Sequence, residues 1–343
     1  MSDNTAVEMM EPDTEEVANK ENSKECEYYQ TVLRPMMSGG HEGELCEWLK
    51  QMGLLRRSAQ CSNPDCKGRS PMCWRKARIV DKYNWACPDC TRKVSIREGS
   101  FFLSIKCEMK AIIRCMLGWC ERTSIDVTSS QLDLKQHVVR RVYERCTDVA
   151  QAYVLSRPQD WLLGGDGAVV VVDVFPDGYM SERRGTGRDK RVLCIADTGH
   201  VPARIWAALL EHAGQQVGAQ PGTVDEVLGH VRSHVRPGST LVVSERSRAC
   251  PHEMLQGIPD YPSTISVETL MGLDLPGTRR IQENLETIWH SAVEVCEEIQ
   301  EMPTRSGASL LNEYMWRQLF AVTPSSAMQS LLHHIADQFP LQD

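Results

Sequence analysis

The chain has 343 residues, of which 41% are hydrophobic and 24% are charged, a composition typical of globular proteins with room for two or three domains. No apolar run reaches the roughly 18 residues of a membrane-spanning helix, and the acidic N-terminus does not resemble a secretory signal. We therefore expect a soluble intracellular protein without a membrane partner. In that setting the fourteen cysteines favour free thiols and metal ligands over disulfides.

The formal net charge of -8 is unevenly distributed along the chain. Residues 1–30 hold nine acids against two lysines, whereas residues 56–97 hold eleven Lys and Arg against three Asp, a local net charge of +8. Basic patches accompany phosphate binding, although a solvated surface gives the same pattern. Residues 1–25 are acidic and contain no aromatic residue, which predicts a disordered tail.

Residues 26–58 form an N-terminal segment in which apolar residues recur at helical spacing. The clearest recurrence runs from Leu45 to Leu55 and predicts one amphipathic helix over residues 42–56.

Two cysteine pairs mark residues 59–102. Cys61 and Cys66 form the first pair, Cys87 and Cys90 form the second, and a Pro-Asp turn lies inside each. Zn²⁺ prefers four tetrahedral ligands, and two such pairs supply them from two tight turns. We predict a structural zinc ribbon whose pairs are joined by a β-hairpin, with Cys73 as a spare cysteine that could replace one ligand.

Basic and aromatic residues alternate along the predicted ribbon. The aromatic residues are Trp74, Tyr83 and Trp85. The candidate DNA-binding residues are Arg75, Lys76, Arg78, Arg92 and Lys93. This mixture suits contacts to a DNA backbone, although many zinc ribbons are purely structural.

Residues 103–160 read as helical. We expect helices over residues 103–119 and 135–154, with Ser129 and Ser130 as candidate caps of the second. The arrangement resembles a helix-turn-helix, whose second helix would present Lys135, Arg140 and Arg141 to DNA. A helical linker packed on the next domain is the alternative.

Residues 161–320 are rich in short apolar runs. A buried strand over residues 165–175 carries a carboxylate, Asp173, near its end. Further strands and helices are predicted as follows: strands over residues 192–197, 202–206, 239–244 and 263–267, and helices over residues 223–235 and 281–299. This order predicts a mixed α/β fold of the RNase H-like kind, in which three carboxylates hold two Mg²⁺ ions for phosphoryl transfer. Residues 321–343 should end in a short helix over 327–336, with His333 and His334 at its surface or cap.

The run from Arg92 to Phe102, directly after the second cysteine pair, resembles a run of the Merlin and ISXO2-like transposases. Further similarity lies at residues 170–174, 237–244, 284–289 and 310–317, so the resemblance covers about residues 60–320. It implies an RNase H-like (DDE transposase) domain whose three acids would stand at Asp173, Ser244 and Glu286.

The departures from the family pattern indicate lost chemistry. Ser244 has no charge to offset divalent ions, and Val174 and Glu283 replace an acid and an Asn of the family. Glu245 is adjacent to Ser244 but would face the other side of a strand. We therefore expect no productive Mg²⁺ site, with Asp173 and Glu286 as remnants held by Arg or Lys partners.

The resulting hypothesis is a domesticated, catalytically inactive transposase that binds DNA or chromatin in the nucleus. Two alternatives stay open: an adaptor that binds proteins through the old DNA-binding surfaces, and an active Mg²⁺-dependent transposase or nuclease in which Glu245 or Glu283 replaces the lost acid. The resembled transposases act as multimers, which is compatible with a homodimer, although no heptad pattern indicates one.

Overall fold

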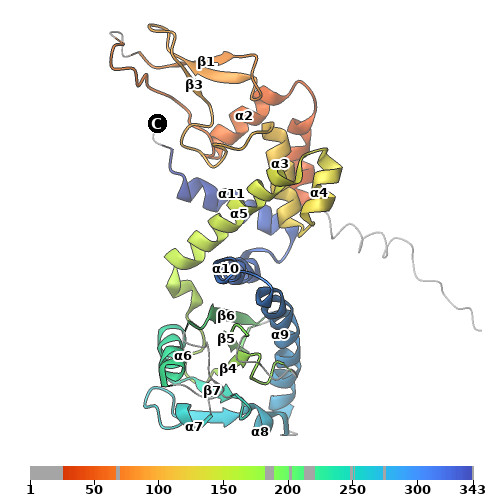
Figure 1. Ribbon diagram of the computed structural model, residues 1–343, viewed down its shortest axis with the longest axis vertical. Coiled ribbons are helices and arrows are strands. Elements are labelled where there is room, and N and C mark those ends of the chain that lie inside the picture. Colours follow the sequence, from red (N-terminus) through yellow and green to blue (C-terminus); the bar gives the residue numbers. More distant parts are fainter. Residues whose placement is uncertain are drawn as a thin grey trace, which may run out of the picture. The chain divides into compact units, whose positions relative to one another are not determined.

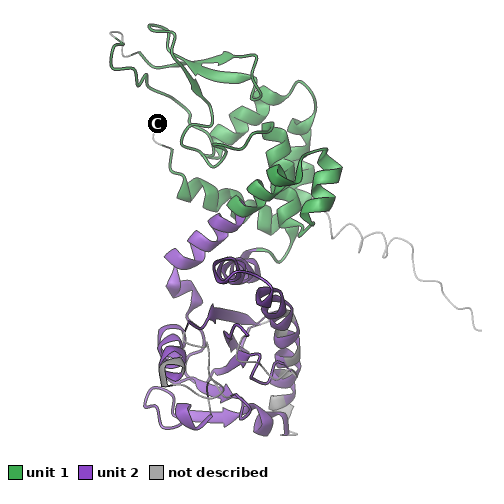
Figure 2. Ribbon diagram, in the orientation of Figure 1, with its two compact units in different colours: residues 1–145, 321–343 green, residues 146–320 purple. Residues whose placement is uncertain are grey.

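The structure is a computed structural model that describes residues 26–66, 70–181, 189–200, 203–211, 221–247, 250, 252–272 and 276–341. The predicted disordered tail, residues 1–25, lies outside the described residues. The chain divides into two compact units (Figure 2): residues 1–145 with 321–343 form unit 1, and residues 146–320 form unit 2. The boundary between the units lies within residues 103–160, which the sequence presented as one helical segment, and the C-terminal segment belongs to the unit that contains the cysteine pairs.

Unit 1 begins with two short helical turns, η1 (Tyr29–Leu33) and η2 (Arg34–Met37), followed by the helix α2 (Glu42–Gln51). Sequence periodicity placed the end of α2 at residue 56, but the helix ends five residues earlier. Gly53 adopts a left-handed φ of 72°, and the amide of Leu54 bonds back to the carbonyl of Leu49. This is a Schellman-type helix end. The apolar residues Leu54 and Leu55 continue the helical spacing beyond it, so the spacing alone does not indicate where the helix ends.

Residues 73–95 form a three-stranded antiparallel sheet of β1 (Cys73–Lys76), β2 (Tyr83–Ala86) and β3 (Lys93–Ser95); the first cysteine pair precedes β1, and the second lies between β2 and β3. Strands β1 and β2 form the hairpin expected between the pairs, with Trp74 opposite Trp85. Because side chains alternate along a strand, Trp74 and Trp85 share one face while Cys73 and Arg75 share the other.

The remaining helices of unit 1 are α3 (Met109–Cys120), α4 (Ile125–Leu132), the first half of α5 (Gln136–Ser156) and α11 (Pro324–Gln338). α3 begins six residues later than expected, after a run of turns over residues 97–104. Ser129 and Ser130 are not caps of α5, because they lie inside α4. The cap in this region is Ser124, whose side chain accepts from the amide of Val127 at the start of α4.

α11 packs against α3 (Figure 1), where the Sγ of Cys120 lies 3.8 Å from the Sδ of Met328. The prediction that both histidines of α11 lie at the surface is wrong for His334, which is 5% exposed, whereas His333 is exposed. The helical period places residues 327, 328, 331, 332 and 335 on the buried face, and His334 flanks that face.

Unit 2 is built on a five-stranded mixed sheet. Its strands are β4 (Val169–Phe175), β5 (Val192–Asp197), β6 (Arg204–Leu209), β7 (Thr240–Val243) and β8 (Ser263–Ser266). The order is β6-β5-β4-β7-β8: β4, β5 and β6 are antiparallel neighbours, and β7 and β8 add parallel to β4. The first strand of the unit is therefore the central one, as its uninterrupted apolar run requires.

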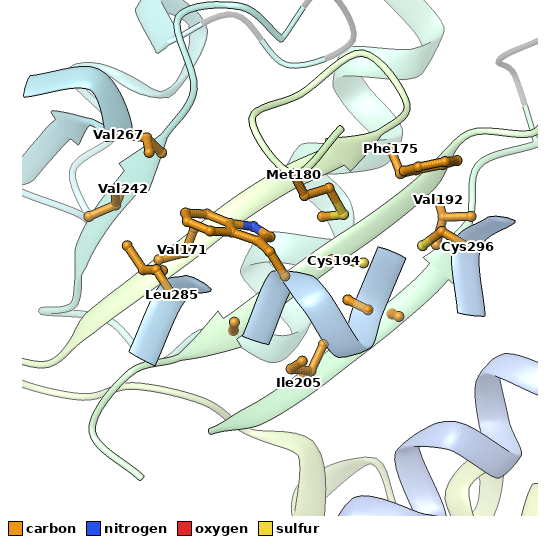
Figure 3. Packing of buried hydrophobic residues seen from close by; sticks show 14 of the residues in the cluster. Val171, Phe175, Met180, Val192, Cys194, Ile205, Val242, Val267, Leu285 and Cys296 are labelled. Atoms are coloured by element: carbon orange, nitrogen blue, oxygen red, sulfur yellow. The ribbon is translucent and has the colours of Figure 1, made fainter. Parts of the chain in front are cut away.

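The helices of unit 2 cover both faces and one edge of this sheet. They are η3 (Pro158–Trp161), α6 (Pro221–His234), α7 (His252–Leu255), α8 (Val267–Gly272), α9 (Pro276–Gln300) and α10 (Thr304–Phe320). α9 covers the face that carries Val171 and Phe175, and Figure 3 shows these side chains with Leu285 and Cys296 in one core. Trp206 points to the opposite face, where its ring stacks on His234 of α6.

α10 closes the open edge of the sheet. The outward amides of β6 bond to its side chains: the amide of Ile205 donates to Gln318 Oε1 at 2.9 Å, and the amide of Ala207 lies 3.2 Å from Met315 Sδ. An edge strand covered in this way is not available for pairing with another chain. Among the described residues, no helix is both long and apolar enough to cross a membrane.

Candidate functional site

The two cysteine pairs come together in unit 1 as one cluster of four sulfurs. Each pair lies on a tight turn. The amide of Cys66 bonds to the carbonyl of Asn63 at 3.0 Å in the first turn, and the amide of Thr91 bonds to the carbonyl of Cys87 at 3.1 Å in the second. Thr91, directly after the second pair, has a left-handed φ of 59°, and the next residue, Arg92, accepts a hydrogen bond from the amide of Cys87 at 2.8 Å.

The sulfur positions test whether the cluster fits a metal ion. The Sγ atoms of Cys61 and Cys90 are 3.5 Å apart, those of Cys66 and Cys87 are 3.6 Å apart, and all four lie within 4.8 Å of one another. These distances are far too long for disulfides. Tetrahedral Zn–S bonds of about 2.3 Å would place the sulfurs about 3.8 Å apart. The four cysteines can therefore hold a metal ion.

Within the cluster, the surroundings of Cys90 favour a thiolate. Hydrogen bonds from the backbone of Arg92 and from the side chain of Asn63 lower the pKa of Cys90 to about 6. Metal binding requires deprotonated sulfur, so these bonds assist it. Cys73 is exposed and lies outside the group of four, so the structure gives no support to its predicted role as a replacement ligand.

The aromatic residues of the hairpin are used for packing, contrary to the expectation that they contact DNA. Trp74 stacks on Tyr83 with ring centres 5.3 Å apart and meets Trp85 edge-on at 5.0 Å. The ammonium of Lys50, from α2, lies 3.5 Å from the centre of the Trp74 ring. This face of the sheet is therefore covered by α2, and Trp85 is only 5% exposed.

The predicted basic residues remain exposed. All eight DNA-binding candidates are solvent-exposed: Arg75, Lys76, Arg78, Arg92, Lys93, Lys135, Arg140 and Arg141. Arg75 and Lys93 share the sheet face opposite the tryptophans, because Cys73, Ala86 and Lys93 form one row across the three strands. In the second group, Lys135 precedes α5 instead of lying within it.

Arg97, also in the basic stretch, is buried and structural. Its Nε lies 2.9 Å from Asp81 Oδ2, and its terminal nitrogens donate to Asp81 and to the carbonyls of Ile105 and Cys107. Both partners of the ion pair are less than one-tenth exposed. The pair therefore fixes the β1–β2 turn to the segment that leads into α3.

In unit 2, Asp173 lies on β4 and is sealed from solvent. Its side chain points toward α9, on the same face as Val171 and Phe175, and the residue is 1% exposed. The amide of Tyr179 donates to Oδ1 at 3.1 Å and the amide of Met180 donates to Oδ2 at 2.8 Å. A turn over residues 176–180 thus folds directly onto both carboxylate oxygens.

Burial raises the pKa of Asp173 to about 6, even though the amides of Met180, Tyr179 and Val174 act in the opposite direction and Glu268 adds to the rise. The expected cationic partners are not found: among the described residues no Lys or Arg forms an ion pair with Asp173, and backbone amides hold it instead. A carboxylate with both oxygens committed in this way is poorly placed to bind a divalent ion.

Ser244, at the second predicted acid position, is fully buried and makes local hydrogen bonds. Its hydroxyl donates to Glu268 Oε1 at 3.0 Å and accepts from the amide of Arg246 at 3.1 Å. The amide of Glu245 donates to the other carboxylate oxygen of Glu268, also at 3.0 Å. Glu268 therefore organises the turn that follows β7.

Glu268 was not singled out in the sequence. It follows β8, and β8 runs parallel to β7, so the segments after both strands meet at one edge of the sheet. The sequence alone could have indicated the contact between Glu268 and Ser244 only if the order of β7 and β8 in the sheet were known.

The proposed replacements for the lost acid do not gather around Asp173. Glu245 is exposed, and Glu283 is exposed and lies 3.7 Å from Arg279 on its own helix. Glu286 belongs to α9, but its side chain lies outside the described residues. Within the described part of the chain, the four cysteines are the one group of three or more metal-ligating side chains close enough to share an ion.

Unit 2 also contains a cavity of about 350 Å³ between β6, α10 and the end of α5. Its walls are mainly apolar and include Leu155, Trp161, Leu209 and Met315. None of the predicted site residues lines it. The cavity has room for an apolar group but offers no cluster of charged side chains for phosphate or metal chemistry.

The chain matches no protein-family model, no curated protein and no solved structure.

Proposed function

We propose that this protein is a catalytically inactive, transposase-derived DNA-binding protein, with a zinc ribbon over residues 59–102 and an RNase H-like domain over residues 161–320. The strand order supports the second assignment. The sheet has three antiparallel strands, β4 to β6, and two strands, β7 and β8, that run parallel to β4 at its centre. A long helix, α9, follows the last strand. RNase H-like domains have this arrangement.

The zinc assignment for Cys61, Cys66, Cys87 and Cys90 is supported by their sulfur spacing and by the all-thiolate donor set, which suits Zn²⁺ in a closed structural site. Bound there, the ion would tie the two turns to the hairpin between them. It has no open coordination position for a substrate, so its role is to stabilise the fold.

The sealed carboxylate of Asp173 is the observation that carries the inactive assignment. In two-metal phosphoryl transfer the carboxylates face a site that admits both ions and DNA. Here both oxygens of Asp173 accept backbone amides beneath the 176–180 turn, and Ser244 supplies a hydroxyl bonded to Glu268 where a second acid would be needed. These contacts support the proposal that no productive Mg²⁺ site remains at these positions.

The DNA-binding assignment is supported by the exposed cations of the hairpin and of the segment after it. None of Arg75, Lys76, Arg78, Arg92 and Lys93 has an acidic partner among the described residues. Unpaired cations on a rigid sheet are suited to phosphate contacts, which carry most non-specific DNA affinity. A nuclear, chromatin-associated location would follow from this function.

The test is a salt-titrated DNA-binding assay on the zinc-loaded full-length protein. We expect binding that weakens steeply with salt. An Arg75→Ala/Lys93→Ala variant loses two cations that contact phosphates. The magnitude of its slope of log K against log salt should therefore be smaller by about 1.8. The matched control is Arg232→Ala/Arg305→Ala, which removes two exposed cations from unit 2 and should leave the slope unchanged.

A second variant tests the metal. Cys87→Ser/Cys90→Ser should lose zinc and DNA binding together, because the hairpin loses its support. Binding with no salt dependence, or an unchanged slope in the Arg75→Ala/Lys93→Ala variant, would contradict the proposed surface. Strand cleavage in the presence of Mg²⁺ or Mn²⁺ that disappears in Asp173→Ala would contradict the inactive assignment.

A further inference from the structure

The tip of the β1–β2 hairpin presents two neighbouring aliphatic side chains to solvent. Ile79 is 45% exposed and Val80 is 54% exposed. The turn that carries them is closed by the amide of Ala77 bonded to the carbonyl of Lys82 at 2.8 Å, and by the amide of Lys82 bonded to the carbonyl of Ile79 at 3.0 Å. One exposed aliphatic residue needs no explanation, but two in succession in a hairpin turn call for one.

The charges around this tip are all positive at the surface. Arg78 and Lys82 flank the aliphatic pair, and Arg75 and Lys76 lie on the adjoining strand, all exposed. The one acid of the turn, Asp81, is withdrawn into the unit by its ion pair with Arg97, and its side chain is only 8% exposed. The tip therefore displays an apolar pair bordered by cations, without an exposed carboxylate in the turn.

The tip is also held on a rigid base. The four cysteines lie at one end of the hairpin, and Trp74 and Lys50 fix its inner face to α2. Arg97 holds the turn by joining Asp81 to the carbonyls of Ile105 and Cys107. Because the hairpin is fixed at both its base and its turn, little conformational entropy is lost when the tip binds a ligand.

We propose that Ile79 and Val80 form a wedge that inserts into the minor groove of duplex DNA between neighbouring base pairs, while the flanking cations hold the two phosphate backbones. Aliphatic side chains that partly unstack a base step and kink the duplex are an established mode of minor-groove binding, and cations beside them are the usual companions. This inference rests on the proposed DNA-binding function and adds its mode: binding with deformation at flexible steps instead of base reading in the major groove.

An anionic membrane would also attract a basic apolar tip. Two short aliphatic side chains bury little hydrocarbon, however, and even a full myristoyl chain gives only marginal membrane binding. The size of the apolar pair suits one base step better than a lipid bilayer. Duplex DNA is therefore the ligand that the tip fits best.

The experiment measures bending by energy transfer between dyes on the two ends of a TA-rich duplex of about 25 base pairs, a length at which kinks of 20–90° change the end-to-end distance. The zinc-loaded full-length protein should shorten that distance. An Ile79→Ser/Val80→Ser variant should bind with the same salt slope but leave the duplex straight. Val127→Ser is the matched control: it removes an exposed aliphatic side chain (46% exposed) from α4 of the same unit and should bend DNA as the wild type does.

The outcomes separate this inference from the proposed function. Salt-dependent binding with a straight duplex in the wild type, or equal bending by the Ile79→Ser/Val80→Ser variant, would overturn the wedge and leave DNA binding in place. No DNA binding by the wild type would overturn both. Sedimentation with vesicles of anionic phosphatidylserine that is lost in the Ile79→Ser/Val80→Ser variant, without any bending of DNA, would assign the tip to a membrane surface and overturn the wedge.

Discussion

Replacing Gly178 by Ala tests whether Asp173 is sealed under the 176–180 turn. A Cβ at position 178 would lie 1.7 Å from Oδ1 of Asp173 and 2.4 Å from its Cγ, although real Cβ atoms essentially never approach a heavy atom closer than 3.0 Å. The carboxylate cannot swing aside freely, because the amides of Tyr179 and Met180 hold both of its oxygens. The variant must therefore break these bonds or displace the turn.

The expected cost follows from those two bonds. A hydrogen bond to a charged group contributes roughly 1.5–3 kcal/mol, so losing both should lower the free energy of unfolding of unit 2 by about 3–6 kcal/mol. Asp173→Ala alone should also destabilise unit 2, because it leaves the same amides unpaired. In Asp173→Ala/Gly178→Ala the added methyl group occupies space that the carboxylate has left. The two effects should therefore be non-additive, with a coupling energy of at least about 2 kcal/mol.

The measurement is urea unfolding of the full chain, combined with hydrogen exchange of the peptides that contain β4 and the turn, because two units need not unfold together. Gly229→Ala is the control: a Cβ there meets nothing within 4 Å on the exposed side of α6, and the change should be neutral or stabilising by up to ~1 kcal/mol. Additive effects of Asp173→Ala and Gly178→Ala, or a Gly178→Ala variant as stable as the wild type, would show that the turn does not seal the carboxylate.

Three further predictions concern stability. Removing metal with a chelator should abolish the protection of the β1–β3 amides from hydrogen exchange, and Cys73→Ser should leave that protection unchanged, since its sulfur lies outside the cluster. Asp81→Asn should lower the free energy of unfolding, measured with urea, by about 3–5 kcal/mol, because it leaves the buried guanidinium of Arg97 without its carboxylate. The control Glu144→Gln removes an exposed ion pair and should lower it by less than ~1 kcal/mol. Asp173 has a pKa of about 6 when folded against 3.8 as the unperturbed value, so it binds a proton more tightly in the folded state. The free energy of unfolding should therefore fall as the pH rises from about 4 to about 6, by up to ~3 kcal/mol, and a flat profile in this window would contradict the burial of the carboxylate.

The features that could be predicted from the sequence are those encoded locally. The spacing of the cysteine pairs predicted the cluster of four sulfurs, and the apolar runs predicted five strands whose bounds agree with the structure to within a few residues. The strand that carries Asp173 was expected to be buried, and it is the centre of its sheet. In each case the predictive feature, either the spacing of the cysteines or the run of apolar residues, lies within one short stretch of the sequence.

The features that could not be predicted depend on contacts between distant segments. Trp74 and Trp85 suggested a nucleic-acid surface, but α2 covers them, and no pattern within the hairpin reveals which of its faces is covered. Glu268 became relevant only once β7 and β8 were seen to be parallel neighbours. The burial of Asp173 depends on the turn over residues 176–180, and its close approach requires Gly178, a residue whose lack of a side chain carries no hydrophobic signal.

If the proposed function is correct, placing a carboxylate at position 244 should not by itself create a cutting site. The hydroxyl of Ser244 lies 3.0 Å from Glu268 Oε1 in a fully buried position, so an Asp there would face a second carboxylate at contact distance. Like charges that close raise the pKa of one partner and destabilise the fold, and an added Mg²⁺ or Mn²⁺ ion could offset this only by reaching both groups. Asp173 would still accept two amides beneath its turn. We therefore expect Ser244→Asp to unfold at lower urea concentration than the wild type, with no recovery on adding Mg²⁺ or Mn²⁺ and no strand cleavage. Recovery of stability by either ion would mean that these carboxylates can assemble a metal site, and would contradict the proposal that the site is inactive.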